Sequence, residues 1–251
     1  MQALILEKLD AIEAEHGVRI LYACESGSRG WGFASKDSDY DVRFIYCHRR
    51  DWYLTVGAPR DVIELPINDV LDINGWDLRK ALQLMRKSNP TLLEWLSSPI
   101  VYREDAGTIT QFRALAEQSY VPQACLTHYL QMARGNFRDY LKADEIWVKK
   151  YFYVLRPILA CLWIEAGYSV VPMPFDALVQ RTVTDDHLQS AIDALKRRKM
   201  AGDELDRGPR NHVISAFLER ELDRLNSAQR PMPNAKPTLD EADALFRSVL
   251  R

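Results

Sequence analysis

Cysteine is scarce in this chain of 251 residues, and the sequence contains no CxxC pair. The four cysteines lie far apart, at Cys24, Cys47, Cys125 and Cys161. This spacing argues against a zinc ribbon and against a thioredoxin-like motif, so we expect four free thiols, mostly buried. The five histidines also show no metal-ligand spacing, and no Ser-His-Asp or Cys-His arrangement can be argued from the sequence.

Long hydrophobic runs are missing as well. The longest, from Arg156 to Glu165, covers about half a membrane span. The N-terminal segment MQALILEKLDAIEAEHG carries acidic and basic side chains throughout and offers no uninterrupted apolar region for a signal peptide. We therefore expect a cytoplasmic protein that does not interact with membranes.

An excess of either charge is absent, since 33 Lys and Arg face 35 Asp and Glu. The net charge of -2 excludes a bulk polyanion binder, although local basic patches such as Arg197-Arg198-Lys199 remain. Known RNA-binding patterns of the RRM, KH and zinc-knuckle types are not found. With 47% hydrophobic and 10% aromatic residues, the chain can bury a real core, which argues against long-range disorder.

Hydrophobic periodicity predicts two regions of different class. An amphipathic helix ends at His16-Gly17. The expected elements that follow are strands over 18–24 and 40–46, one or two short strands within 61–73 broken near Pro66, helices over 77–87 and 91–96, and a strand over 100–102. From residue 108 the pattern is helical, over 108–118, 122–142, 145–166, 185–200, 210–226 and 238–249.

The predicted class is therefore α/β (α+β), with a mixed sheet and flanking helices in residues 1–107 and an all-helical domain in 108–251. Pro157 is expected to kink the third of the later helices. Thr238 and Glu241 have the spacing of a capping box that would start the last one.

The residues that carry chemistry follow the first predicted strand. Gly27-Ser28 opens a short helix, and its small residues allow backbone N–H groups to approach a triphosphate. Ten residues later, Asp39-Tyr40-Asp41 begins the next strand, and strand alternation puts Asp39 and Asp41 on one face. Two adjacent carboxylates are stable when a cation lies between them, and oxygen-only ligands at a phosphate site favour Mg²⁺.

Each half of this pattern has a simpler interpretation. A Gly-Ser pair after a strand is usually a tight turn, and an Asp-x-Asp on a strand is usually a solvated edge. Their occurrence together at this separation favours a triphosphate and metal site.

The order of these motifs resembles the signature of the DNA polymerase beta-like nucleotidyltransferase superfamily. Longer windows, GSRGWGFASKDSDYDVRFIY, DINGWDLRKALQLM, KSNPTLLEWLSSPIVY and KKYFYVLRPILACLWI, resemble one branch, the RNA ligase-associated or RNA repair-pathway nucleotidyltransferases. The resemblance implies a nucleotidyltransferase-type sheet. It also implies attack by an acceptor hydroxyl on the α-phosphate of a nucleoside triphosphate, with two Mg²⁺ ions, or Mn²⁺ as an alternative, held by three carboxylates.

Asp39 and Asp41 match the first two carboxylates of the family. The third is expected on a later strand, where Leu71-Asp72-Ile73 has the apolar-Asp-apolar form. Asp72 also precedes Asn74-Gly75, which is predicted to form a turn that ends the strand. Glu64 has the same form and Asp69 is close by, so both remain alternatives to Asp72.

The sequence also predicts roles or positions for other side chains near the motif. Arg29 directly follows the Gly-Ser pair and is expected to help bind the nucleotide, and Arg43 shares the strand face of Asp39 and Asp41. Asp37 is expected in a solvated turn. Trp31 and Phe33 are expected in the core rather than as stacking platforms for a base.

A basic stripe marks the predicted helical half. Lys149, Tyr153 and Arg156 share one helix face, and Lys150 lies beside them. Such a stripe is usually a solvated face, but this helix is strongly apolar, so Lys149, Lys150 and Tyr153 are also candidates for nucleotide binding. Lys80 either forms a local salt bridge or faces the same cleft.

The leading hypothesis is a Mg²⁺-dependent nucleotidyltransferase that moves an NMP from an NTP to an acceptor hydroxyl. The resemblance favours RNA, including tRNA or an RNA end, as the acceptor. Two alternatives stay open: a non-catalytic NTP-sensing or partner-binding protein, and a toxin-like nucleotidyltransferase that acts on tRNA or on protein.

Overall fold

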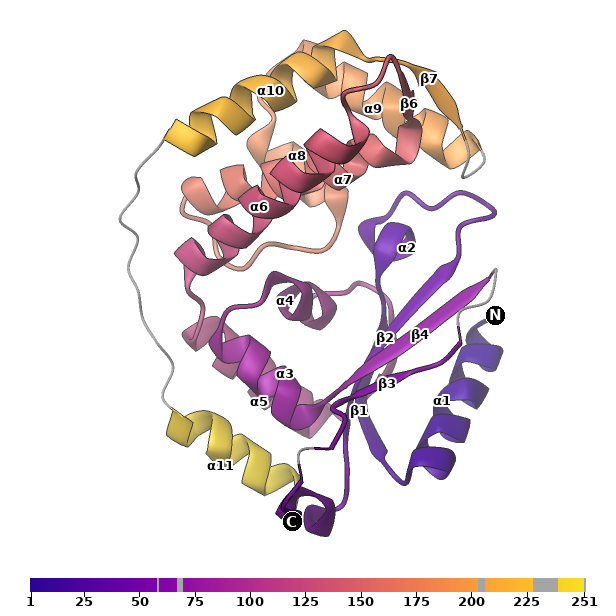
Figure 1. Ribbon diagram of the computed structural model, residues 1–251, viewed down its shortest axis with the longest axis vertical. Helices are drawn as coiled ribbons and strands as arrows, with labels where there is room; N and C mark the ends of the chain where they lie inside the picture. Colours follow the sequence, from indigo (N-terminus) through magenta and orange to yellow (C-terminus); the bar gives the residue numbers. More distant parts are fainter. Residues whose placement is uncertain (58, 67–69, 203–205, 228–238, 251) are drawn as a thin grey trace. The chain divides into compact units, whose positions relative to one another are not determined.

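The computed structural model describes residues 1–57, 59–66, 70–202, 206–227 and 239–250, and these form two compact units (Figure 1). The sheet unit contains Met1–Gly30, Asp39–Val121 and the C-terminal helix α11 (Leu239–Val249). The helical unit contains Trp31–Ser38 and the helices that begin at Pro122. Each unit is described separately below.

The sheet unit is built on one mixed five-stranded sheet with the order β3-β4-β2-β1-β5. The two central strands β2 (Tyr40–Cys47) and β4 (Leu71–Asp77) pair in parallel, and every other neighbour pairs antiparallel. The remaining strands are β1 (Arg19–Glu25), β3 (Val62–Glu64) and β5 (Val101–Glu104). The predicted mixed sheet is therefore confirmed.

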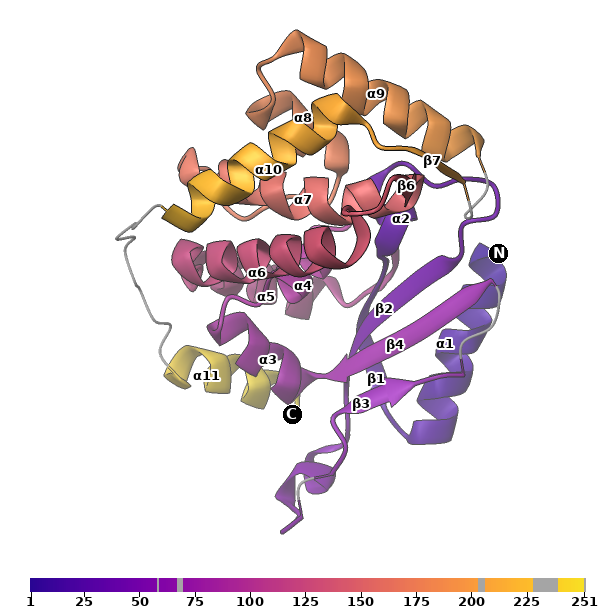
Figure 2. The same cartoon turned by 45° about the horizontal axis from the view of Figure 1, so that its top comes forward.

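Helices pack on both faces of this sheet, as the two views in Figures 1 and 2 show for α1 and α3. Three of them begin at side-chain caps that accept backbone N–H bonds: Asp77 before α3, Asn89 before α4 and Asp105 before α5. The helical segments of the sheet unit are α1 (Gln2–His16), the short α2 (Gly27–Trp31), η1 (Arg50–Leu54), α3 (Leu78–Arg86), α4 (Pro90–Leu96), α5 (Ala106–Gln118) and α11.

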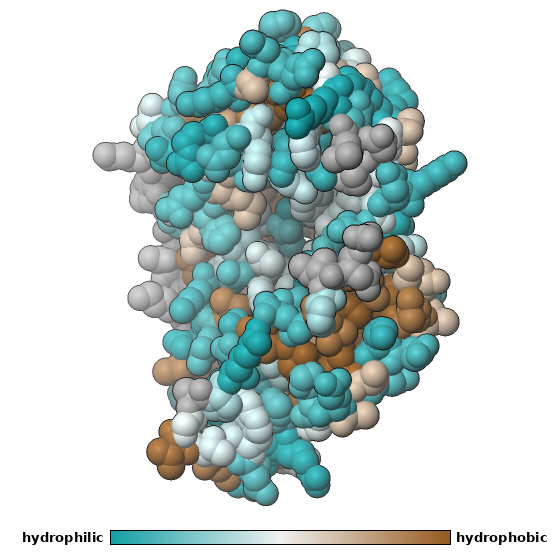
Figure 3. All heavy atoms as spheres, turned by 45° about the vertical axis from the view of Figure 1, so that its right-hand side comes forward, coloured by the Kyte–Doolittle hydropathy of each residue, from teal (hydrophilic) through white to brown (hydrophobic). Residues whose placement is uncertain are grey.

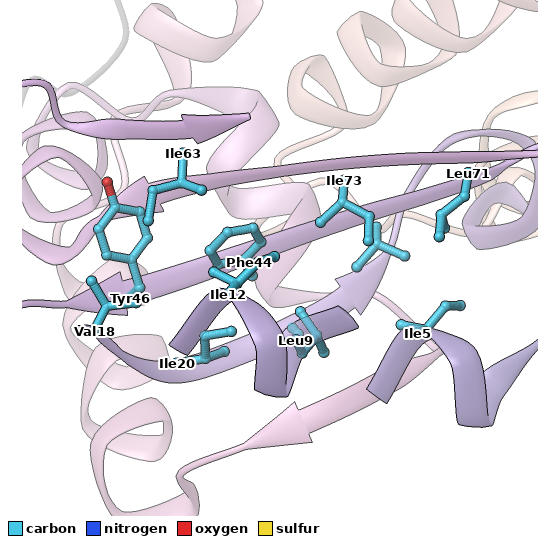
Figure 4. Packing of buried hydrophobic residues seen from close by; sticks show 12 residues of the cluster. Ile5, Leu9, Ile12, Val18, Ile20, Phe44, Tyr46, Ile63, Leu71 and Ile73 are labelled. Atoms are coloured by element: carbon cyan, nitrogen blue, oxygen red, sulfur yellow. The ribbon is translucent and has the colours of Figure 1, made fainter. Parts of the chain in front are cut away.

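One core of the sheet unit lies between α1 and the sheet (Figure 4). Ile5, Leu9 and Ile12 of α1 are fully or almost fully buried against strand residues that include Phe44 and Ile73. On β2 the core takes the even-numbered side chains, Val42, Phe44 and Tyr46. Because side chains alternate along a strand, Asp41 and Arg43 point to the opposite face.

The helical unit consists of packed helices and a two-stranded sheet. Its elements are α6 (Pro122–Tyr140), β6 (Glu145–Trp147), α7 (Val148–Glu165), α8 (Phe175–Thr182), α9 (Asp186–Ala201), β7 (Arg207–Pro209) and α10 (His212–Ser227). The aromatic ring of Phe33 stacks on Phe152 with centroids 4.4 Å apart and meets Phe175 edge-on. These contacts explain why the segment Trp31–Ser38 belongs to this unit, and they put Phe33 in the core as predicted.

The two units differ from the predicted division at residue 107. Helix α5 belongs to the sheet unit because its buried side chains, such as Ile109 and Phe112, pack toward the sheet, and α11 packs against α3 and α5. The helix predicted over 145–166 begins only at Val148, because residues 145–147 pair with β7. The sequence prediction also missed α8. The proposed capping residue Thr238 lies outside the described residues.

Strand β4 also differs from its prediction. The expected turn at Asn74-Gly75 is absent, and the strand continues to Asp77. Gly75 pairs with Phe44 in the parallel ladder, and a Cβ on Gly75 would lie 2.2 Å from the Phe44 ring. The glycine therefore makes room for an aromatic ring within the sheet and does not form a turn.

Hydrophobic residues gather on the surface near α1 and the outer strands (Figure 3). A cavity of about 460 Å³ lies there, lined mainly by Ala11, Ile12, Leu65, Pro66, Leu71 and Ile73. Among the helices in the described part of the chain, none combines the length and the apolar character that crossing a membrane requires.

Candidate nucleotide and metal site

Two carboxylates face each other across the centre of the sheet. Asp41 on β2 pairs directly with Asp72 on β4 in the parallel register. Both side chains lie on the face opposite the α1 core and keep 22% and 23% of their surface exposed. The parallel pairing thus makes neighbours of two carboxylates that are far apart in the sequence.

Arg43 lies between these carboxylates. Its Nη2 atom is 3.0 Å from Asp41 Oδ1 and 2.7 Å from Asp72 Oδ2, so both oxygens lie within hydrogen-bond reach of one nitrogen atom. Arg43 Nη1 also donates to the backbone oxygens of Val42 and Asp72. One positive charge thus lies between two negative charges, so the three ionised side chains together carry a formal charge of -1.

Asp39 and Arg29 lie next to this pair. Arg29 Nε donates to the backbone oxygen of Asp39 at 3.0 Å, and its guanidinium covers the Tyr40 ring at 3.7 Å. Arg29 therefore holds the backbone just before β2. The Asp39 side chain itself is exposed.

Burial raises the pKa of Asp41 above the ordinary value for an aspartate. Arg43 opposes this shift, while the charges of Asp39 and Asp72 raise the pKa further. The ionised form of Asp41 is thus incompletely compensated by the protein. A cation bound at these carboxylates would stabilise that form.

The Gly27-Ser28 turn lies directly against Asp41. Ser26 N donates to the Asp41 backbone oxygen at 2.8 Å, and Gly27 has a positive φ of 55°. A Cβ on Gly27 would lie 1.9 Å from Asp41 Oδ2. Position 27 thus requires glycine both for its backbone conformation and for the approach of the carboxylate. The two halves of the sequence motif meet at this point.

Glu25 is a residue of this site that the sequence prediction missed. It is fully buried at the end of β1, and its Oε1 accepts the Asp41 backbone N–H at 2.8 Å. The Tyr102 hydroxyl donates to Glu25 Oε2. Burial raises the pKa of Glu25, and these two hydrogen bonds oppose that shift. Its position next to Ser26-Gly27 was the only signal in the sequence.

The alternatives to Asp72 are placed differently. Glu64 is about half exposed, forms an ion pair with Arg60 and accepts a hydrogen bond from Asn74 Nδ2 at 3.0 Å. Asp69 lies outside the described residues. Among the residues that are described, no group of three or more His, Cys, Asp or Glu side chains is close enough to hold a metal ion. The metal-binding role of Asp39, Asp41 and Asp72 therefore remains a prediction.

The candidates from the predicted helical half lie in α7 of the helical unit. The Lys150 ammonium group is 3.9 Å from the centre of the Tyr140 ring and 4.5 Å from that of Tyr153. Lys149 lies 5.6 Å from the centre of the Trp147 ring. All three candidates are half-buried, and their role in binding a nucleotide remains a prediction.

Several subsidiary residues have structural partners. Arg156 is buried, donates to the backbone oxygens of Pro172 and Met173, and covers Trp31, so it is not part of an exposed basic stripe. Lys80 forms an ion pair with Asp61 at 2.8 Å, which agrees with the local salt bridge that was one of the two alternatives predicted for it. Asp37 lies in an exposed turn, as predicted.

Comparison with known proteins shows which sequences and structures this chain is similar to. Residues 1–248 match the sequence model of RlaP, the RNA repair pathway DNA polymerase beta family. The chain is 50% identical over 236 residues to the uncharacterized protein YcgL of Bacillus subtilis (strain 168), a match that covers 94% of this chain and 91% of that protein. It also aligns with the crystal structure of a nucleotidyltransferase-like protein from Exiguobacterium sibiricum 255-15, with 13% identity, a TM-score of 0.30, and coverage of 96% of this chain and 85% of the other. The match to the family over almost the whole chain, together with the half-identical relative, shows that this protein belongs to the RNA repair pathway DNA polymerase beta family.

Proposed function

We propose that this protein is a Mg²⁺-dependent nucleotidyltransferase that transfers an NMP from an NTP to a hydroxyl group of RNA. The observation that carries the proposal is the direct pairing of Asp41 with Asp72, with Gly27 packed against the Asp41 carboxylate. This arrangement brings a carboxylate pair and a glycine turn into direct contact. Membership of the DNA polymerase beta-like family supports the same chemistry.

The donor atoms of the side chains at this site are of the kind that a hard divalent cation prefers. Asp39, Asp41 and Asp72 offer only oxygen donors, which Mg²⁺ prefers and Mn²⁺ also accepts. The partial exposure of Asp41 and Asp72 leaves them accessible, and Arg43 offsets only one of their two charges. When bound, Mg²⁺ would polarise the α-phosphate and neutralise the charge of the leaving pyrophosphate.

The residues of this chain would supply position and charge. The Gly27-Ser28 turn, which contacts Asp41, would bring its backbone N–H groups to the triphosphate. Glu25 fixes the backbone of Asp41, and Arg29 fixes that of Asp39. Lys149, Lys150 and Tyr153 are part of this proposal as further nucleotide-binding residues, since a lysine can neutralise phosphate oxygens.

The reaction can be followed with four NTPs, each labelled at the α-phosphate, incubated with the purified protein, cell lysate and Mg²⁺. We expect label from at least one NTP to enter a product that ribonuclease digests. Label in a protein product would instead favour a toxin-like transferase that modifies protein. Binding of NTP with no labelled product in any fraction would favour a non-catalytic sensor and contradict the proposal.

A further inference from the structure

A second cavity of the sheet unit lies at the other end of the central strands. It has a volume of about 540 Å³ and is bounded by the start of β1, the end of β2 with the loop that follows, and the end of α11. Cavities of this size hold nucleotide-sized ligands in many proteins. Its lining includes Arg19, Cys47, His48, Arg49, Arg50 and Val249.

The charged side chains described in this lining are basic. Its described residues include three arginines and a histidine and, among them, no aspartate or glutamate. Arg19 is fixed in place, because Nη1 binds Asp105 at 2.9 Å and Nη2 donates to the backbone oxygen of Val249 at 3.0 Å. Arg49 and Arg50 are exposed, and within the described ranges their side chains form no hydrogen bond or ion pair. Two guanidinium groups without a partner in the described part of the chain thus lie at a cavity whose described lining has no acidic side chain.

A flat aromatic pair lies beside the arginines. The His48 ring stacks on Trp52 with centroids 3.7 Å apart and planes inclined by 10°. Both rings are only half-buried. Of the two rings, His48 lines the cavity. An aromatic ring next to arginines is the combination that binds a base together with its phosphate. A bare inorganic anion would leave the aromatic surface unused.

This cavity is separate from the carboxylate site. In the antiparallel pairing of β1 with β2, Arg19 lies opposite Cys47 at one end and Glu25 lies opposite Val42 at the other. The length of β1 from Arg19 to Glu25 corresponds to about 20 Å along an extended strand. A mononucleotide bound at Asp41 therefore cannot also occupy the cavity.

We propose that the cavity formed by Arg19, His48, Arg49 and Arg50 is a second nucleotide-binding site, in which the arginines hold phosphate and the His48 ring, supported by Trp52, stacks against the base. The ligand is either a free nucleotide or one nucleotide of an RNA strand, since both carry the same chemistry. The inference goes beyond the proposed transfer reaction and does not depend on it.

The test measures binding by isothermal titration calorimetry in EDTA, with AMP, ATP and a short single-stranded oligoribonucleotide as separate probes. The key variant is Arg49→Ala/Arg50→Ala. Its matched control is Arg134→Ala/Arg197→Ala, which removes two arginines that are also exposed. We expect the Arg49/Arg50 variant to weaken binding at least tenfold, while the control variant binds like the wild type.

The probes distinguish the two sources of the ligand. Binding of AMP or ATP would indicate a free nucleotide, and binding of the oligoribonucleotide only would indicate an RNA strand; both support the site. Absence of binding by all three probes would overturn the proposal. An equal loss in the Arg134/Arg197 control, or unchanged binding by the Arg49/Arg50 variant, would overturn it as well.

Discussion

Replacement of Gly27 by alanine tests the contact between the glycine turn and Asp41. Gly27 has a φ of 55°, so alanine at this position carries a backbone penalty of about 1–2 kcal/mol. The added Cβ would also lie 1.9 Å from Asp41 Oδ2, whereas ordinary contacts begin at 3.4 Å. The carboxylate must therefore retreat from its place beside the turn before alanine can be accommodated.

Gly17 provides a matched control. Its φ of 61° is almost the same, but a Cβ there would meet no atom within 4 Å. Gly17→Ala should therefore show the backbone penalty without the displacement of Asp41. Both variants are expected to lower the free energy of unfolding by at least about 1 kcal/mol, which urea denaturation measures.

Transfer activity should separate the two variants. Because a displacement of about 1 Å at a catalytic group can cost roughly 100-fold in rate, we expect Gly27→Ala to lose at least that much NMP transfer. This corresponds to about 2.7 kcal/mol of transition-state stabilisation. Gly17→Ala should retain its activity within about twofold, a difference of about 0.4 kcal/mol. Equal activity of the two variants would refute the argument that Gly27 positions Asp41.

Three further changes have defined outcomes. Glu25→Ala should lower the free energy of unfolding by at least about 1 kcal/mol in urea denaturation, because it leaves two part-buried donors, the amide of Asp41 and the hydroxyl of Tyr102, without their acceptor, and Glu25→Gln should restore most of this loss. Burial raises the pKa of Asp77. The Asp77 carboxylate therefore binds a proton more tightly in the folded protein than in the unfolded chain. Its contribution to the free energy of unfolding increases as the pH falls from neutral toward the ordinary carboxyl range. Asp77→Asn should remove that part of the pH dependence, as urea denaturation at pH 7 and pH 5 would reveal; an unchanged dependence would contradict it. Replacing Lys149 and Lys150 together by alanine should weaken NTP binding, measured by calorimetry, at least tenfold, or about 1.4 kcal/mol, and unchanged affinity would show that both side chains lie outside the nucleotide site.

The local parts of the site depend on short-range patterns. The glycine that lies against Asp41 was named from a few consecutive residues. Asp39 precedes β2, which begins at Tyr40, so its expected place on the strand face of Asp41 stays a prediction. Most strands and helices of the sheet unit were predicted for the same reason. The match of Asp72 to an apolar-Asp-apolar pattern named a candidate, but only the parallel register puts it opposite Asp41.

The features that the sequence missed depend on distant partners. Glu25 is part of the site because its carboxylate accepts hydrogen bonds from the Asp41 backbone and from the hydroxyl of Tyr102, both of which are distant in the sequence. The expected turn at Gly75 is part of a strand because the Phe44 ring packs on it. Similarly, the segment around Phe33 joins the helical unit through Phe152 and Phe175, which no local pattern reveals. Long-range packing decided each of these cases.

The most direct test of the central claim compares NTPs labelled at the α-phosphate and at the γ-phosphate, with purified protein, the RNA acceptor and Mg²⁺. Nucleotidyl transfer predicts that α-label enters RNA, that γ-label leaves as pyrophosphate, and that Asp41→Asn and Asp72→Asn each lose more than nine-tenths of the transfer, a change of at least about 1.4 kcal/mol. Entry of γ-label into the acceptor, or equal transfer by the wild type and both variants, would contradict the account.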